Sequence, residues 1–317
     1  MFKILVSAPP LVNQRKIFDL TFRNLGFEVT WAHVAQQLPE ADLVSQISKF
    51  DGWILGDDPC TRNVIEAGQS GSLKAIVKWG VGTDNIDFEA IENLKMDFAN
   101  TPGMFGSEVA DVAMGYVIML SRDLISIHNE VLKGGWPKPA GKSLSNKVMG
   151  IVGFGDIGSN IATRAIAAGM KVVAFDTDKK RHLTDSNIKF SDWPSGINQI
   201  DYLILSCPLN VNSYQLINSE IFSQMKRGSF LVNISRGGLI NEEALLNALE
   251  DQILAGAALD VYVKEPLPII SPLLLKENVI FGSHNASNTI EAVRLTSEKT
   301  IELMVNFLKK TSQDKGI

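Results

Sequence analysis

The chain has 317 residues, with 30 Lys and Arg against 35 Asp and Glu and a formal net charge of −5. Hydrophobic residues make up 45% and charged residues 21%, which is the composition of a globular protein and excludes a disordered chain. The length predicts two domains, and the mild acidity argues against a nucleic-acid or membrane-surface partner, which would require a basic face. The two cysteines, Cys60 and Cys207, cannot form a disulfide framework and are typical of a reducing compartment.

The N-terminal sequence MFKILVSAPP has too short an apolar run for a signal peptide and predicts a first β-strand instead. The most apolar long stretch, residues 109–120, contains Asp111 and falls short of the ~20 apolar residues that span a bilayer. We therefore expect a cytoplasmic protein without a membrane partner.

Short runs rich in Val, Ile and Leu alternate with longer amphipathic segments along almost the whole chain. Continuous apolar runs of this length are typical of strands buried on both faces, and their alternation with helices predicts parallel βαβ units. Two doubly wound parallel sheets fit the length, so the predicted class is α/β. The runs are residues 2–8, 52–56, 75–80, 149–155, 171–176, 202–206, 229–234, 255–261 and 279–283.

Two helices lie outside this alternation. One is expected after Ser107, a suitable N-cap, and residues 107–122 are apolar around most of its circumference. Such a helix is buried on all sides, either inside its own domain or in a homodimer interface. The other carries apolar residues from Ile290 to Leu308 with no new sheet after it, so we expect it to pack onto an existing domain. The predicted domains are residues 1–100 with 287–317, and 101–286.

A glycine motif of the form G-x-G-x-x-G follows the strand at residues 149–152 and opens a helical pattern. In this context the first glycine permits a tight turn, the second admits the pyrophosphate of a dinucleotide, and the third permits close helix–strand packing. The motif predicts a dinucleotide site formed by Gly153, Gly155, Asp156, Ile157 and Gly158.

The carboxylate expected on the adenosine ribose is Asp176, at the end of the strand at residues 171–176 and eighteen residues after Gly158. A carboxylate there favours NAD. The alternative is NADP, whose 2′-phosphate the basic run at residues 179–181 would have to hold against repulsion from Asp176, so we interpret that run as a solvated face.

Three further side chains follow predicted strands of the same sheet, namely Arg236, Glu265 and His284. Loops at the carboxyl ends of parallel strands face one crevice, so an Arg, a Glu and a His placed in this way can meet. His284 is the one of the four histidines that ends a strand of the cofactor domain. No cluster of Cys, His and carboxylates has the spacing of metal ligands, and we expect no metal.

Several motifs together resemble the D-isomer-specific 2-hydroxyacid dehydrogenase family, over essentially the whole chain. The resemblance implies a flavodoxin-like substrate domain beside a Rossmann NAD-binding domain, and a homodimer formed through the helix at residues 107–122. The motifs are KWGVGTDNID at 78–87, NTPG at 100–103, GIVGFGDIG at 150–158, NISRGGLI at 233–240 with ALDVYVKEPL at 258–267, and SHNASNTIEA at 283–292.

The resemblance also implies a role for individual residues. Arg236 falls on the family's substrate-binding arginine, His284 on its acid/base, and Glu265 on the carboxylate that raises the histidine pKa. Asp260 falls on the aspartate near the nicotinamide carboxamide, and Cys207 and Ile234 on positions where backbone lines the cofactor. The family has Pro and Ile beside this histidine where Ser283 and Asn285 stand here, and often Gly where Ala286 stands, so details of packing around the loop are in question.

Residues 78–87 are expected to supply the other half of the site. Glycines around Val81 would direct backbone N–H groups at the substrate carboxylate, an anion-binding nest, whereas the plain alternative is a strand-to-helix turn. Lys78 stands beside this nest and is either a ligand for a second anionic group or an ordinary solvated lysine. The same alternatives are open for Lys138 and Lys142 in the loop at residues 135–142, from this subunit or a partner subunit. The substrate-binding residues predicted here are Lys78, Gly80, Val81 and Gly82.

Three functions remain open. The motifs look most like phosphoglycerate dehydrogenase-type members, which implies 3-phosphoglycerate and phosphohydroxypyruvate as the substrate pair. A glyoxylate or hydroxypyruvate reductase would use the same residues. A dinucleotide-sensing regulatory protein would keep the fold, but the acidic balance and the lack of a basic tail argue against it.

Overall fold

The structure is a computed structural model in which residues 1–178 and 188–313 are described. It contains two compact units, one formed by residues 1–104 and 288–317 and the other by residues 105–287. The basic run at residues 179–181, on which the NADP alternative depended, lies outside the described residues.

The first unit contains a sheet of five parallel strands in the order β2-β1-β3-β4-β5. This is the flavodoxin-like order, in which the order of the strands reverses between β1 and β3. The central strands β1, β3 and β4 are almost entirely buried. The strands are β1 (Phe2–Val6), β2 (Phe27–Trp31), β3 (Gly52–Leu55), β4 (Ala75–Lys78) and β5 (Asp97–Ala99).

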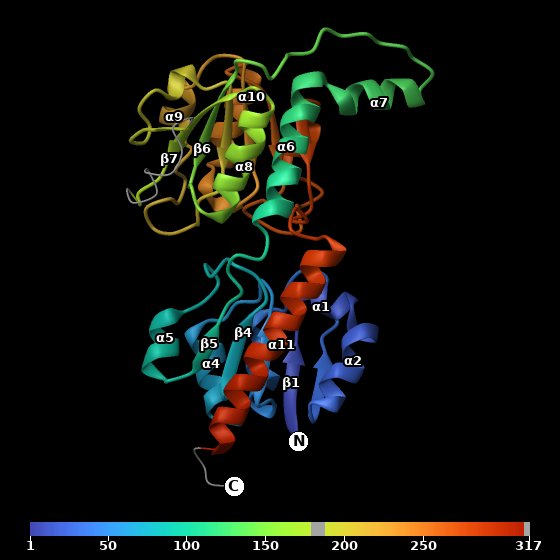
Figure 1. Cartoon of the computed structure of the whole chain (residues 1–317), viewed down its shortest axis with the longest axis vertical. Helices are drawn as coiled ribbons and strands as arrows, with labels where there is room; N and C mark the ends of the chain where they lie inside the picture. The colour runs from blue at the N-terminus through green and yellow to red at the C-terminus, as the bar shows by residue number, and fades with distance from the viewer. Residues whose placement is uncertain (179–187, 314–317) are drawn as a thin grey trace. The chain divides into compact units, whose positions relative to one another are not determined.

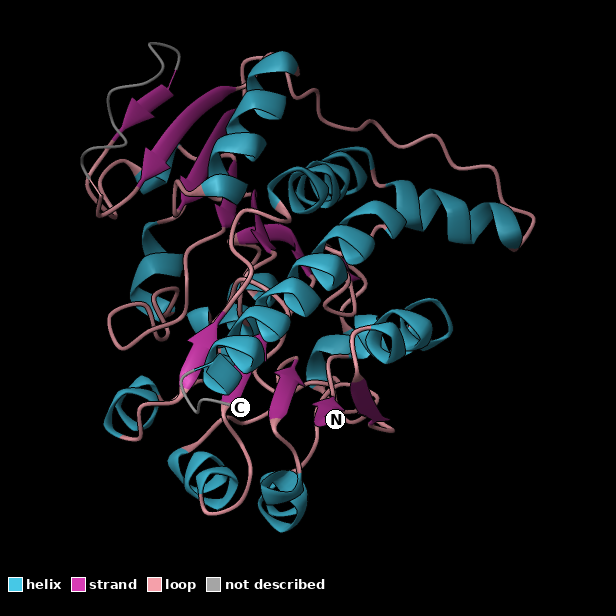
Figure 2. Cartoon of the chain, turned by 60° about the horizontal axis from the view of Figure 1, so that its bottom comes forward, coloured by secondary structure: helices cyan, strands magenta, loops and turns pink. Residues whose placement is uncertain are grey.

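Helices cover the sheet of the first unit, and the longest of them is the C-terminal helix α11 (Figures 1 and 2). It packs against β3 and β4, where Met304 and Leu308 are completely buried. Gly52 in β3 permits this close approach, because a Cβ there would lie 2.5 Å from the Met304 sulfur. The helices are α1 (Pro9–Asn13), α2 (Arg15–Asn24), α3 (Glu40–Gln46), η1 (Ile47–Lys49), α4 (Arg62–Gln69), α5 (Phe88–Asn93) and α11 (Ile290–Gln313).

The second unit contains a sheet of seven parallel strands in the order β12-β11-β10-β9-β6-β7-β8. From β8 to β11 this is the Rossmann order, and β12 extends it by one strand. The predicted class of two parallel-sheet α/β domains is confirmed. The strands are β6 (Val148–Val152), β7 (Lys171–Phe175), β8 (Ile188–Phe190), β9 (Tyr202–Leu205), β10 (Ser229–Asn233), β11 (Leu254–Leu259) and β12 (Val279–Phe281).

The helices of the second unit lie around this sheet, with α6 and α8 packed against each other on one side of it (Figure 1). Helix α6 also contacts β10 and β11. The helices are α6 (Gly106–Arg122), α7 (Leu124–Leu132), α8 (Asp156–Ala167), η3 (Ile197–Gln199), α9 (Ser219–Gln224), η4 (Gly237–Leu239), α10 (Glu242–Glu250) and η5 (Pro272–Leu275).

The start of α6 corrects the predicted N-cap. The helix begins at Gly106, so Ser107 lies inside its first turn, where its hydroxyl accepts a hydrogen bond of 2.8 Å from Arg164. The reason is packing: a Cβ at residue 106 would lie 2.2 Å from the Asp156 carboxylate, so only glycine permits this contact with α8.

The apolar surface of α6 is mostly buried inside its own unit, where α8 and the sheet cover Val109, Ala113 and Val117. The next helix differs, because no residue of α7 is buried. Helix α7 and the segment after it extend away from the sheet (Figure 1), with Leu132 and Trp136 73% and 78% exposed. None of the helices in the described ranges is long and apolar enough to cross a membrane.

Candidate active site

The glycine motif forms the turn between β6 and α8. Gly153 has a φ of +90°, and a Cβ there would lie 2.6 Å from the backbone of Cys207 at the end of β9. A Cβ on Gly158 would lie 2.2 Å from the carbonyl oxygen of Gly153. Gly155 is the N-cap of α8, which begins with Asp156 and Ile157. No residue larger than glycine fits at position 153 or 158. The backbone N–H groups in the first turn of α8 have no acceptor within the helix and point outward at its N-terminus.

Asp176 lies directly beside this turn, after the end of β7. Its Oδ2 accepts a hydrogen bond of 2.5 Å from the backbone N–H of Phe154, and its Oδ1 accepts one of 2.7 Å from that of Asp178. The carboxylate is therefore held in one orientation at the edge of the glycine turn. This is the arrangement that a ribose-binding acid requires, and the residues present fit a dinucleotide.

The segment after β9 is hydrogen-bonded both to the glycine turn and to the segment after β10. The Ser235 hydroxyl donates a hydrogen bond of 2.5 Å to the carbonyl of Cys207, and the Ser206 hydroxyl donates one of 2.7 Å to that of Gly153. Ile234 is 6% exposed. Burial raises the pKa of the Cys207 thiol to about 11, so the sulfur is an uncharged side chain at neutral pH.

The side chains of His284 and Glu265 are in direct contact. The His284 Nδ1 lies 2.7 Å from the Glu265 Oε2, and the two side chains are 25% and 19% exposed. The other carboxylate oxygen of Glu265 accepts a hydrogen bond of 2.9 Å from the backbone N–H of Tyr262. A carboxylate fixed in this way holds the imidazole ring in one orientation.

Asp260 accepts hydrogen bonds from the backbone of the loop that carries His284. It is 2% exposed, its carbonyl oxygen accepts a hydrogen bond of 2.6 Å from the His284 N–H, and its Oδ2 accepts one of 3.0 Å from the Ala286 N–H. The remaining oxygen, Oδ1, accepts one of 3.1 Å from the Tyr116 hydroxyl.

Arg236 is the N-cap residue of η4 and lies in the short segment between β10, which ends at Asn233, and that helix. Its Nη1 donates a hydrogen bond of 2.8 Å to the carbonyl of Ser235, and its own carbonyl accepts one of 2.9 Å from the Asn233 side chain. The next residue, Gly237, packs so tightly that a Cβ would lie 1.9 Å from the backbone of Tyr262. The Arg236 segment is therefore joined to the segment that holds Glu265.

In the first unit, residues 79–82 follow β4, which ends at Lys78. Gly80 has a φ of +128°, which favours glycine, but its N–H donates a hydrogen bond of 2.9 Å to the Thr101 hydroxyl. That N–H is therefore engaged within the unit, contrary to its expected part in an anion nest. Among the described residues, the N–H groups of Val81 and Gly82 make no hydrogen bond, and Val81 is 41% exposed.

Lys78 is not the solvated lysine that one alternative expected. Its side chain is 3% exposed, and its ammonium donates to the carbonyl of Gly56 and to the carboxylate of Asp57, the latter at 2.9 Å. Leu55 and Lys78 are paired across β3 and β4, so Asp57 and the loop at residues 78–82 lie at neighbouring carboxyl ends of the sheet.

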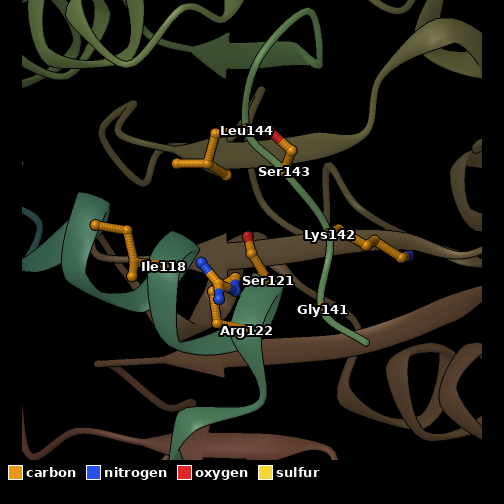
Figure 3. A pocket seen from close by; sticks show the side chains of 7 residues that line it. All are labelled: Ile118, Ser121, Arg122, Gly141, Lys142, Ser143 and Leu144. Atoms are coloured by element: carbon orange, nitrogen blue, oxygen red, sulfur yellow. The ribbon is translucent and has the colours of Figure 1, made fainter. Parts of the chain in front are cut away.

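Lys138 and Lys142 were also open as contacts to a substrate phosphate, and Lys142 has defined contacts within the second unit. The Lys142 ammonium donates a hydrogen bond of 2.9 Å to the carbonyl of Gly228 and lies 4.5 Å from the centre of the Phe230 ring. Gly228 precedes β10 and Arg236 follows it. Within this unit, Lys142 therefore lies at the amino-terminal ends of the strands, and Arg236 lies at their carboxyl ends. Lys142 also borders a cavity of about 380 Å³ at the C-terminal end of α6 (Figure 3).

Three residues that hold candidate site residues went unnoticed in the sequence: Asp57 and Thr101 in the first unit and Tyr262 in the second. Asp57 and Thr101 act on residues 21 positions away along the chain, and Tyr262 acts through its backbone N–H, so no local spacing of side chains indicates them. In the described ranges, no group of three or more His, Cys, Asp or Glu side chains is arranged to hold a metal ion.

The fold and the glycine turn define a dinucleotide-binding protein, and the family model described as D-isomer specific 2-hydroxyacid dehydrogenase, NAD binding domain, matches residues 114–286. The chain therefore belongs to the D-isomer specific 2-hydroxyacid dehydrogenase family. The predicted family and cofactor are confirmed: the chain is an oxidoreductase of the class that acts on CH–OH groups with NAD.

Particular relatives differ in substrate. The chain is 36% identical to a hydroxypyruvate reductase of Thermotoga maritima, over 87% of this chain and 89% of that one. It is 32% identical to a D-3-phosphoglycerate dehydrogenase of Methanocaldococcus jannaschii, over 98% of this chain but only 58% of the longer relative. Among solved structures, the TT0316 protein of Thermus thermophilus superposes with a TM-score of 0.84 at 28% identity, over 96% of both chains.

Proposed function

We propose that the chain interconverts a small D-2-hydroxy acid and its 2-oxo acid, with His284 as the acid/base. The observation that carries this proposal is the 2.7 Å contact between His284 and Glu265. NAD, when bound, supplies or accepts the hydride at C2 of the substrate. In the reduction direction the imidazolium of His284 gives its proton to the carbonyl oxygen, so the C=O bond becomes CH–OH and the ring is left neutral.

Arg236 is proposed to bind the substrate carboxylate together with the carbonyl oxygen. The guanidinium has five N–H donors in a fixed plane, and the bond from Nη1 to Ser235 sets the orientation of that plane. Glu265 keeps the imidazole protonated and oriented, and it is itself held by the backbone of Tyr262.

The cofactor is proposed to lie along the carboxyl ends of the strands in the second unit. Gly153, Gly155, Asp156, Ile157 and Gly158 would receive the pyrophosphate at the start of α8, and Asp176 the hydroxyls of the adenosine ribose. Cys207 and Ile234 would line the cofactor with backbone, and Asp260 would lie near the nicotinamide carboxamide. The NAD-binding unit is then residues 105–287, and the other unit is proposed to hold substrate.

The substrate carboxylate is proposed to bind the backbone of Val81 and Gly82 as well. A second anion would have to be met by Lys78, but the charge of Lys78 is compensated by Asp57 and its side chain is 3% exposed. We therefore place the unphosphorylated acids, hydroxypyruvate or glyoxylate, ahead of phosphohydroxypyruvate. The hydroxypyruvate reductase that this chain matches over 89% of its length supports the same choice.

The test is NADH oxidation with phosphohydroxypyruvate, hydroxypyruvate, glyoxylate and pyruvate in turn, each repeated with NADPH. We expect hydroxypyruvate or glyoxylate to give the highest kcat/KM, with NADH preferred. Asp57→Asn should raise kcat/KM for phosphohydroxypyruvate relative to hydroxypyruvate, because it releases the Lys78 charge. Best turnover of phosphohydroxypyruvate by the unchanged enzyme would restore the phosphoglycerate assignment, and turnover of none of the four would favour the NAD-sensing regulator.

We also propose a homodimer and a cytoplasmic location. The apolar side chains of α7 are partly exposed, Leu132 and Trp136 are mostly exposed, and a second copy of the chain would bury them. Cys60 and Cys207 are both free thiols and lie in different units, as is usual in a reducing compartment.

A further inference from the structure

Tyr116 lies in the middle of α6, in the second unit, and belongs to its buried face. It is 7% exposed, and its hydroxyl donates a hydrogen bond of 3.1 Å to Oδ1 of Asp260, 144 residues further along the chain. The residue contributes to the apolar pattern of α6, yet its polar end is aimed at the only carboxylate oxygen of Asp260 that the loop at residues 282–286 does not use.

The space that holds this hydroxyl exists because residue 282 is glycine. A Cβ on Gly282 would lie 2.3 Å from the Tyr116 oxygen and 2.1 Å from Asp260 Oδ1. Any larger residue at position 282 would displace the hydroxyl, the carboxylate or both. Tyr116 and Gly282 therefore form one steric arrangement around Asp260.

Asp260 in turn holds the backbone on both sides of His284. Its carbonyl accepts the His284 N–H at 2.6 Å, and its Oδ2 accepts the Ala286 N–H at 3.0 Å. His284 has a φ of +53°, a conformation that is uncommon for residues other than glycine and that surrounding contacts must maintain. The hydrogen bonds to Asp260 are among the contacts that hold this conformation.

Burial, together with the charge of Asp260, raises the pKa of the Tyr116 hydroxyl. The hydroxyl therefore keeps its proton at neutral pH, and it remains a donor to Asp260. Without that donor, Oδ1 would be a buried carboxylate oxygen without its partner, and the carboxylate would turn away from the Ala286 N–H to find one.

We propose that Tyr116 is a positioning residue for His284: through Asp260 it holds the loop that keeps the imidazole against Glu265. The proposal rests on the role of His284 in the function proposed above. It assigns to α6 a part in the reaction besides its packing against α8. Loss of the hydroxyl lets the loop relax, which lengthens the contact between His284 and Glu265 and lowers the fraction of imidazolium at neutral pH.

The test compares Tyr116→Phe with Tyr202→Phe in the whole enzyme. Tyr202 is the matched control because it is also a buried tyrosine bonded to α6, with its oxygen 2.9 Å from the Ser121 hydroxyl. It lies in β9, before the carboxyl end of the sheet. For each variant we would measure kcat, KM for the oxo acid, the melting temperature, and the pH above which reduction declines.

For Tyr116→Phe we expect kcat to fall about tenfold, with the decline moved to lower pH, towards the roughly 6.5 of an unperturbed histidine. Tyr202→Phe should lower the melting temperature without moving the pH profile. An unchanged kcat and pH profile in Tyr116→Phe would overturn the proposal, as would an equal shift in Tyr202→Phe.

A third variant, His284→Gln, separates this inference from the function on which it rests. If His284→Gln is inactive while Tyr116→Phe behaves as the unchanged enzyme, the positioning role alone fails. If His284→Gln keeps near-normal activity, the assignment of the acid/base fails first. Gly282→Ala provides a second probe of the same arrangement, since its methyl group would displace the Tyr116 hydroxyl, and we expect it to reproduce the pH shift.

Discussion

In the function proposed above, His284 depends on two neighbours, and they act in different ways. Glu265 supplies a negative charge 2.7 Å from the ring, whereas Asp260 supplies backbone contacts that hold the strained loop. Charge and orientation can therefore be separated by mutation. A substitution at residue 265 should change when the ring is protonated, and a substitution near Asp260 should also change where the ring lies.

Glu265→Gln tests the charge alone, because the amide keeps the size of the side chain. Reduction requires the imidazolium, so its rate falls as the pH rises past the point at which the ring loses its proton. Without the carboxylate that point moves to lower pH, and kcat should fall more at pH 8 than at pH 6, by about tenfold or more. The measurement is a pH profile of kcat for reduction.

Glu242→Gln serves as the control, because Glu242 accepts a bond of 3.2 Å from the N–H of Val263, in the same segment, but does not contact the imidazole. Its profile should follow that of the unchanged enzyme. A Glu265→Gln profile that declines at the original pH would show that the carboxylate does not set the protonation of His284.

At the scale of helices and strands, the sequence was most informative in the interior of the sheets. The central strands β3, β4, β9 and β10 are completely buried and form continuous apolar runs, so they were predicted. The strands without such a run are β2, β5 and β8, and all three lie at sheet edges. An edge strand is covered on fewer sides, so its residues alternate or stay half-exposed and its apolar signal is weak.

The same limit applies to the candidate site. The glycine turn, Asp176, Arg236, Glu265 and His284 were predictable because each follows a recognisable strand. Tyr116 was not, since a tyrosine in an apolar helix is counted as packing. The pairing of Lys78 with Asp57 was not predictable either, because it requires the register between β3 and β4.

Asp58 shows how one buried carboxylate joins several elements of the first unit. It is completely buried, and its oxygens accept hydrogen bonds from the Leu38 N–H at 2.8 Å, the Ser7 hydroxyl at 2.7 Å and the Gly56 N–H at 3.0 Å. The donors come from the segments after β1 and β3 and from the segment before α3. Asp58→Ala leaves all three donors without this acceptor and should lower the free energy of unfolding by ~3 kcal/mol.

The pH dependence of this loss has a definite sign. Burial raises the pKa of Asp58 above its ordinary value, outweighing the hydrogen bonds that lower it. A folded-state pKa above the unfolded one adds stability at acid pH that is lost as the pH rises through the folded value. In urea unfolding, the advantage of the unchanged protein over Asp58→Ala should be larger near pH 4 than near pH 7. An advantage that grows with pH would contradict this account of Asp58.

On the scale of the whole molecule, the first unit is built from two separate segments of chain, with α11 packed on β3 and β4. The second unit carries the exposed apolar arm formed by α7 and Trp136. The proposed dimer follows from this arm more than from α6, because α6 is already covered by α8 and the sheet. The sequence left two interpretations of the apolar helix, burial inside its own domain and a homodimer interface. The first applies to α6, and the second is proposed for α7 instead.

The dimer is tested by placing charge on the arm. Sedimentation of the unchanged protein should give about twice the 34.7 kDa of one chain, and Leu132→Glu with Trp136→Glu should give one chain. The control is Leu20→Glu, which charges a 65% exposed leucine of α2 in the other unit. A dimer that survives the double substitution, or an unchanged protein that sediments as one chain, would exclude the arm as the interface.

The central claim is that His284 supplies the proton as the carbonyl is reduced, and His284→Gln tests it most directly. The measurement is kcat for NADH-dependent reduction of the best oxo acid, made together with the Kd for NADH by fluorescence. We expect kcat to fall by about 10²–10⁴-fold, the share that general acid catalysis contributes, with the Kd for NADH nearly unchanged. A variant that binds NADH and reduces the oxo acid at close to the original rate would contradict the claim.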